Sequence, residues 1–162
     1  MPTTESELER DAIIGAVNRA TETVFSTMLA MAVQAQPALD RPDPELLDGV
    51  VGLLGFTGGW VGTGMLFCED RFACRVGSAM LMHECKEINA DVLDGIGEMA
   101  NMILGNFKEA VEGHTGPLSL SVPTVVYGKN FSTRTSIHVP WIVVPFQLDQ
   151  DVFQVRVCMK AR

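Results

Sequence analysis

The segment Asp94-Gly-Ile-Gly-Glu-Met-Ala-Asn101 lies in the second half of the chain. Its polar functional side chains are Asp94, Glu98 and Asn101, and at about 100° per residue a helix places these three on one face. Apolar residues gather on the opposite side of the same helix: Ile96, Met99, Ala100, Ile103, Phe107 and Ala110. The segment therefore predicts an amphipathic helix that packs one face and presents a carboxylate and a carboxamide on the other.

Glycines accompany this polar face. Gly95 and Gly97 lie inside the segment, and Gly105 follows one turn after Asn101. A glycine costs about 1 kcal/mol relative to alanine inside a helix, so a merely solvated face would favour better helix formers. We expect the bare backbone at Gly97 and Gly105 to allow close approach by a binding partner.

The composition restricts the class of protein. The 162 residues are 47% hydrophobic and 20% charged, which is typical of a compact globular protein, and we expect one domain over residues 1–162. The formal net charge of -8 argues against binding to nucleic acid or to an anionic membrane surface, since both require a basic footprint.

Targeting segments are not evident in the sequence. The first residues are acidic where a secretory signal needs a basic flank and an apolar core, and no apolar run reaches the length of about 18 residues that a membrane-spanning helix needs. We therefore expect a cytoplasmic protein without membrane insertion. The four cysteines show no C-x-x-C pairing, and we expect buried thiols rather than disulfides or metal ligands.

Periodicity and turn residues predict the elements before the motif. A long helix is expected over residues 5–34, followed by a loop over residues 36–44 that contains Pro37, Pro42 and Pro44. Apolar runs over residues 47–56 and 60–68 predict a β-hairpin, because glycines separate them.

The motif helix has predictable ends. A helix is expected over residues 69–83, and Asn89 is the expected N-cap of the motif helix over residues 90–111. Alternating β-branched segments then predict strands at 118–127, 133–146 and 152–159. Pro140 and Pro145 cannot donate to a ladder, so the middle strand should have an edge or a bulge there. The predicted fold is α+β, with long helices packed on an antiparallel sheet.

The first helix holds a weak copy of the motif. Asp11, Gly15 and Asn18 repeat the spacing, with glycine in place of the glutamate. Each copy precedes a strand region, so we expect two loosely repeated helix-plus-strands halves. Because the first copy lacks the acid, one site per chain is predicted, and the role of Asn18 stays open.

The motif and its setting resemble the CheC/CheX/FliY chemotaxis phosphatases. The resemblance rests on Asp94, Glu98 and Asn101, on Pro123 at the start of a strand a little over twenty residues later, and on the long first helix and the glycine-rich hairpin. It covers most of the chain. A single intact copy is similar to the CheX type, since CheC-like members typically carry two.

The resemblance implies an activity and a partner. It implies hydrolysis of the aspartyl phosphate of a CheY-like response regulator receiver domain, with Asn101 orienting the attacking water and Glu98 anchoring the helix to the receiver's phosphate-site lysine. Asp94 is then expected at the rim of the interface. The resemblance implies no cofactor in this chain, because the Mg²⁺ belongs to the receiver. It also implies a homodimer, with residues 137–146 as one candidate region.

Other interpretations stay open at this point. A non-catalytic receiver-binding adaptor would keep the fold and the partner surface without turnover. A structural dimerisation domain would be indifferent to Glu98 and Asn101. An ordinary solvated face, continued by Lys108 and Glu112, would explain the polar residues without any partner.

Overall fold

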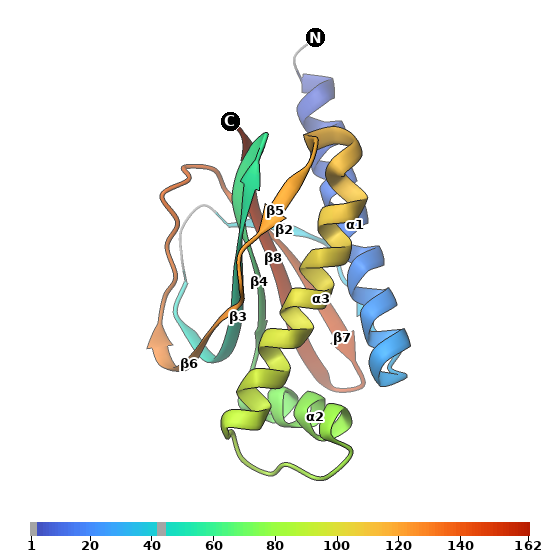
Figure 1. Cartoon of the computed structure of the whole chain (residues 1–162), viewed down its shortest axis with the longest axis vertical. Helices are drawn as coiled ribbons and strands as arrows, with labels where there is room; N and C mark the ends of the chain where they lie inside the picture. Colours follow the sequence, from blue (N-terminus) through green and yellow to red (C-terminus); the bar gives the residue numbers. More distant parts are fainter. Residues whose placement is uncertain (1–2, 42–44) are drawn as a thin grey trace.

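Three helices pack on one eight-stranded antiparallel sheet (Figure 1). The computed structural model describes residues 3–41 and 45–162, so Pro42 and Pro44 of the predicted loop lie outside the described residues. The elements in chain order are α1 (Thr3–Leu29), β1 (Gln34–Ala35), β2 (Leu39–Arg41), β3 (Leu47–Gly58), β4 (Trp60–Cys68), α2 (Asp70–Leu81), α3 (Ala90–Thr115), β5 (Leu118–Leu120), β6 (Thr124–Phe131), β7 (Trp141–Leu148) and β8 (Asp151–Ala161). The predicted α+β class is confirmed.

Several predicted boundaries need correction. The first helix ends at Leu29 rather than near residue 34, because Ala30 adopts a left-handed conformation with φ 52° and the Met31 N–H bonds the Phe25 carbonyl at 3.1 Å. Strand β2 occupies part of the predicted proline loop, and β1 lies directly before that loop. The motif helix continues past residue 111 to Thr115, and Ala110 on its predicted apolar face is exposed.

The prolines of the predicted middle strand behave as that residue type requires. Pro140 lies before β7, and Pro145 lies within β7. Strand β7 pairs with β8 on one side and with β1 and β2 on the other. Gln36 donates its backbone N–H to the Pro145 carbonyl at 2.8 Å. Because the N–H and C=O of one strand residue point to the same side, the missing donor of Pro145 faces the break between β1 and β2. β7 is therefore an inner strand, which corrects the expectation of a free edge within residues 137–146.

The predicted strand over residues 118–127 divides into β5 and β6, which both pair with β3. Leu120 lies opposite Phe56, and Thr124 lies opposite Leu53. Two residues of β3 therefore face the three residues 121–123, which connect β5 to β6. This count defines a β-bulge of one extra residue, a device that re-aims a side chain locally.

The sheet allows α3 to approach it very closely. A Cβ built on Gly52 of β3 would lie 2.8 Å from the Ala100 Cβ, and one built on Gly64 of β4 would lie 2.6 Å from a Leu104 methyl carbon. Real Cβ atoms essentially never approach so closely. These glycines of the hairpin therefore provide the space in which α3 packs.

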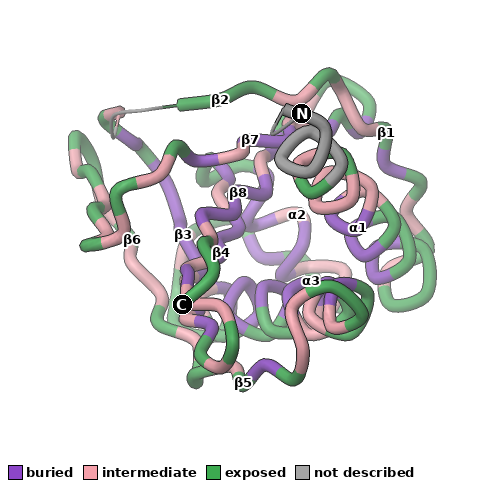
Figure 2. Tube along the Cα trace, turned by 90° about the horizontal axis from the view of Figure 1, so that it is seen from above, coloured by how far each residue is buried: buried purple, intermediate pink, exposed green. Residues whose placement is uncertain are grey.

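Buried side chains form two clusters, one on each face of the sheet. Figure 2 shows the larger group of buried residues between the helices and the strands. A stack of Phe25, Phe153 and Phe146 joins α1 to β8 and β7, with ring centroids 4.8 and 5.3 Å apart. The smaller cluster, on the other face, includes Val51 and Trp141. None of the described helices is long and apolar enough to cross a membrane.

We expect Gly52→Ala to lower the free energy of unfolding by about 1–3 kcal/mol, because the added methyl group would push α3 away from β3. Gly55→Ala on the same strand is the matched control, since its nearest neighbour, the Ser121 hydroxyl, would be 3.7 Å from the added Cβ. Urea denaturation of both variants makes the comparison. Equal stability of the two variants would show that the close packing of α3 on β3 does not limit the stability of the fold.

Candidate functional site

The predicted N-cap fixes the start of the motif helix. The Asn89 side chain accepts a hydrogen bond from the Val92 N–H at 2.9 Å, and Asn89 has extended backbone angles. The cap therefore satisfies one of the free backbone donors that every helix N-terminus carries. This bond confirms the predicted cap and sets the register of Asp94, Glu98 and Asn101 along α3.

The three motif side chains lie together on the solvent side of α3. Asp94, Glu98 and Asn101 are all exposed, whereas Ile96, Met99 and Ala100 on the other side are fully buried. Within the described residues, the three polar side chains make no hydrogen bond or ion pair with another part of the chain. Their donors and acceptors are therefore available to a molecule from outside.

The glycines of the motif have different surroundings. Gly97 is buried, and a Cβ there would lie 3.0 Å from Val125 and 3.9 Å from Pro123. It allows β6 and the residues before it to lie against α3, which corrects the expectation of open backbone at Gly97. Gly95 is also buried, beside Met80 of α2. Gly105 is half-buried, and nothing lies within 4 Å of a Cβ built on it.

The polar face changes character after Gly105. Lys108 and Glu112 form an ion pair at 3.3 Å, and Glu112 also accepts the Leu118 N–H at 2.9 Å. The bond from Leu118, with a further contribution from Lys108, lowers the pKa of the Glu112 carboxyl. These two residues tie the end of α3 to β5, so the residues on this face with free functional groups are Asp94, Glu98 and Asn101.

The weak copy of the motif in α1 has different surroundings from the intact copy. The Arg19 guanidinium covers Gly15, because a Cβ there would lie 3.3 Å from its nitrogen. Asn18 is half-buried, and its side-chain carbonyl oxygen is shielded from solvent without a hydrogen-bond partner among the described residues. Of the two asparagines, only Asn101 is exposed.

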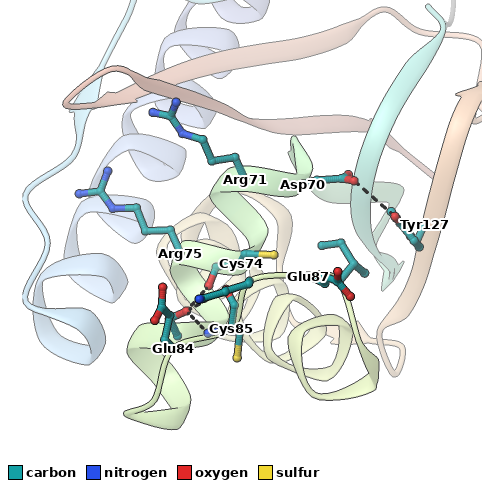
Figure 3. A pocket seen from close by; sticks show the side chains of 11 residues that line it. Asp70, Arg71, Cys74, Arg75, Glu84, Cys85, Glu87 and Tyr127 are labelled. Carbon is teal, nitrogen blue, oxygen red and sulfur yellow. Dashed lines mark hydrogen bonds between the residues drawn. The ribbon is translucent and has the colours of Figure 1, made fainter.

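A polar hollow opens elsewhere, between α2, the α2–α3 connection and β6 (Figure 3). Some of its polar groups bond within the protein: the Tyr127 hydroxyl lies 3.3 Å from the Asp70 carboxylate, and the Cys85 N–H donates to the Ser78 hydroxyl at 2.8 Å. The Cys74 and Cys85 sulfurs point in different directions in Figure 3. Burial, and then the Asp70 charge, raise the pKa of the Cys74 thiol, which disfavours the nucleophilic thiolate.

All four cysteines are free in the structure, and all four are buried, as the sequence predicted.

Val122 was not predicted as a functional residue. Val122 lies in the bulge beside α3 and is 83% exposed. From the sequence alone, its β-branched side chain indicated only an ordinary strand position. The nearest sequence signal is Pro123, which interrupts donation to a ladder at that point.

Solved structures with the same fold come from chemotaxis proteins. A CheC-like superfamily protein from a Shewanella species superposes with a TM-score of 0.83 at 22% identity, covering 93% of this chain and 98% of that one. The chemotaxis protein CheX from Desulfovibrio desulfuricans gives 0.80 at 26% identity, covering 91% and 99%. A chain of the CheX–CheY–BeF₃–Mg²⁺ complex from Borrelia burgdorferi gives 0.75 at 21% identity, covering 91% and 97%.

A family profile gives the sequence-level assignment. The profile described as chemotaxis phosphatase CheX matches residues 50–147, a range that contains most of the hairpin, α2, α3 with its motif, and the β5–β6 bulge. No curated protein matches the chain by sequence. The profile covers more than half of the 162 residues, and the chain therefore belongs to the CheX family of chemotaxis phosphatases.

Proposed function

We propose that this protein hydrolyses the aspartyl phosphate of a CheY-like receiver domain by inserting Glu98 and Asn101 into the receiver's active site. The observation that carries the proposal is the pair itself. Glu98 and Asn101 are exposed, lie one turn apart on a helix packed tightly against the sheet, and have no partner among the described residues. The CheX family assignment supports phosphatase activity, and the Borrelia burgdorferi CheX was solved bound to CheY with BeF₃ and Mg²⁺.

The phosphatase has to contribute little to this reaction beyond positioning one water molecule. The water oxygen bonds to phosphorus as the bond from phosphorus to the carboxylate oxygen breaks. The aspartate leaves as a carboxylate, and both hydrogens of the water remain with the inorganic phosphate. In-line positioning of two reactants is a large part of such catalysis. In this proposal the Mg²⁺ and the phosphate-site lysine come from the receiver.

Asn101 suits the water-positioning role because its carboxamide is neutral and has both kinds of hydrogen-bonding group. Its carbonyl oxygen accepts from the water, and its NH₂ donates to the water oxygen. A carboxylate in the same place would be repelled by the phosphoryl oxygens. Glu98, one turn earlier, has the charge that a lysine ammonium requires, and a charge-assisted hydrogen bond would hold α3 in register. Asp94 lies a further turn away, at the rim.

Two expectations are kept as proposals: the homodimer that the family resemblance implies, and the cytoplasmic location expected from the sequence. In the described part of the chain, the outer strands of the sheet are β5 and β6 at one side and β1 and β2 at the other. A dimer that extends the sheet would use one of these edges rather than β7. Both proposals are independent of the roles assigned to Glu98 and Asn101.

We expect Asn101→Ala to lower the turnover of a phosphorylated CheY-like receiver by about 100-fold or more while receiver binding stays nearly unchanged, because loss of the amide leaves the water unpositioned. Asn106→Ala is the matched control, since Asn106 is an exposed asparagine on another side of the same helix. Phosphate release, followed over a range of receiver concentrations, tests both variants. Wild-type turnover in Asn101→Ala would refute the assigned role, and binding without turnover in the wild type would indicate an adaptor.

We expect Glu98→Ala to weaken receiver binding by about 10- to 100-fold and to lower turnover as well, since a hydrogen bond between two charged groups is lost. Glu109→Ala removes an exposed glutamate from the same helix outside the motif and should leave both quantities unchanged. Titration of the receiver loaded with beryllofluoride and Mg²⁺ measures the binding. Equal effects of the two substitutions would argue for a general loss of charge rather than for an anchor.

Gly105→Ala should have opposite effects on stability and on binding. The methyl group meets nothing within the protein, so we expect the free energy of unfolding to rise by about 0.5–1 kcal/mol. The same methyl group would stand on the surface proposed to face the receiver, so the KM for the phosphorylated receiver should increase. Urea denaturation and receiver kinetics measure the two effects. Higher stability with an unchanged KM would remove Gly105 from the partner surface.

A further inference from the structure

Val122 occupies an unusual position for an apolar side chain. It lies in the middle of the one-residue bulge between β5 and β6, where residues 121–123 face only two residues of β3. Its side chain is 83% exposed, which places it among the most exposed large apolar residues of the described chain. Bulges occur frequently beside active sites, where they re-aim a side chain. Here the bulge turns a valine away from the core.

The backbone around Val122 is fixed from both sides. The Ser121 N–H donates to the Gly55 carbonyl at 3.0 Å, and the Gly55 N–H donates to the Ser121 hydroxyl at 2.8 Å. Pro123 packs next to Gly97 and restricts the residue before it to extended conformations. A β-branched side chain adds its own stiffness. Val122 therefore has little conformational entropy to lose when a partner covers it.

The bulge lies on the same side of the molecule as the proposed catalytic pair. Pro123 lies 3.9 Å from the position of a Cβ built on Gly97. Asn101 follows Gly97 by four residues, so Gly97 and Asn101 lie on neighbouring turns of α3. Val122 precedes Pro123 directly. The bulge that carries Val122 therefore lies beside the part of α3 that carries Glu98 and Asn101.

We propose that Val122 is a docking residue that the phosphorylated receiver covers when α3 reaches the receiver's phosphorylation site. The inference rests on the proposed function and assigns a recognition element to that same site. The acidic Asp94 and Glu98 suit the cationic phosphate site of the receiver, whereas the bulge supplies contact area that charges alone lack. Val122 contacts the receiver outside the reacting atoms, so it affects affinity and not the chemical step.

The test compares two exposed valines. Val122→Thr keeps the branched shape and the backbone preference before Pro123 but replaces a methyl group by a hydroxyl. Val152→Thr, at a 51% exposed valine on β8, is the matched control, since β8 is separated from β6 by β4 and β3. The probe is a CheY-like receiver of the same organism, loaded with beryllofluoride and Mg²⁺. Val122→Ala is measured alongside, since it shortens the side chain without adding a polar group.

We expect both Val122 variants to raise the dissociation constant about three- to tenfold, in line with the loss of one or two buried methyl groups. The kcat at saturating phosphorylated receiver should stay within about twofold, because the reacting groups are untouched. Val152→Thr should bind as the wild type does. The thermal unfolding of all three variants should match the wild type, since the substituted side chains are exposed.

Three results would overturn the proposal. Wild-type affinity in both Val122 variants would show that the receiver does not cover this side chain. A change in self-association by sedimentation, without a change in receiver affinity, would assign Val122 to a contact between copies of this chain. Absence of receiver binding by the wild type would remove the partner itself. Failure of the proposed function is recognised separately, by full turnover in Asn101→Ala.

Discussion

The close contact between α3 and the hairpin β3–β4 is the constraint on which the rest of the structure depends. Gly52 and Gly64 leave room for Ala100 and Leu104, so the helix packs where any larger strand residue would exclude it. A helix in such contact cannot rotate about its axis without opening the core, because protein interiors are close-packed. The Asn89 cap and the bond between Glu112 and Leu118 fix its two ends. The direction in which Glu98 and Asn101 point is therefore a consequence of packing on the opposite face.

The same constraint explains how so few polar residues can form a site. A phosphatase that uses the chemical groups of its partner needs accurate position more than reactive side chains. Asp94, Glu98 and Asn101 are carried on a rigid helix rather than on a loop, and their side chains have no partners among the described residues to give up on binding. Gly97 brings β6 and the residues before it to the side of α3, since its missing side chain lets Pro123 and Val125 lie against the helix. The helix and the bulge thereby form one surface.

The motif helix, its cap and the hairpin were predictable because each depends on residues close together in the chain. Asn89 and Val92 are three residues apart, and the amphipathic period of α3 repeats every few residues. The errors lie where distant segments meet. The early end of α1 at Ala30, the short strands β1 and β2, and the division of residues 118–127 all depend on neighbours in space. Residues 133–140, which were predicted to be strand, lie outside any strand, and Ile137 and Val139 cover the outer cluster.

The sequence by itself determined that Asp94, Glu98 and Asn101 face solvent, because helical periodicity converts spacing into direction without reference to the rest of the chain. It also determined that one intact motif is present, since the copy at Asp11 and Asn18 lacks the acid. Only the tertiary structure decided what each glycine does. Gly97 lies against Val125 while Gly105 lies open, although both are glycines on one helix, because a missing side chain acquires its role from what lies across from it. The exposure of Val122 was likewise set by the register of β5 and β6 on β3, a pairing between segments far apart in the chain.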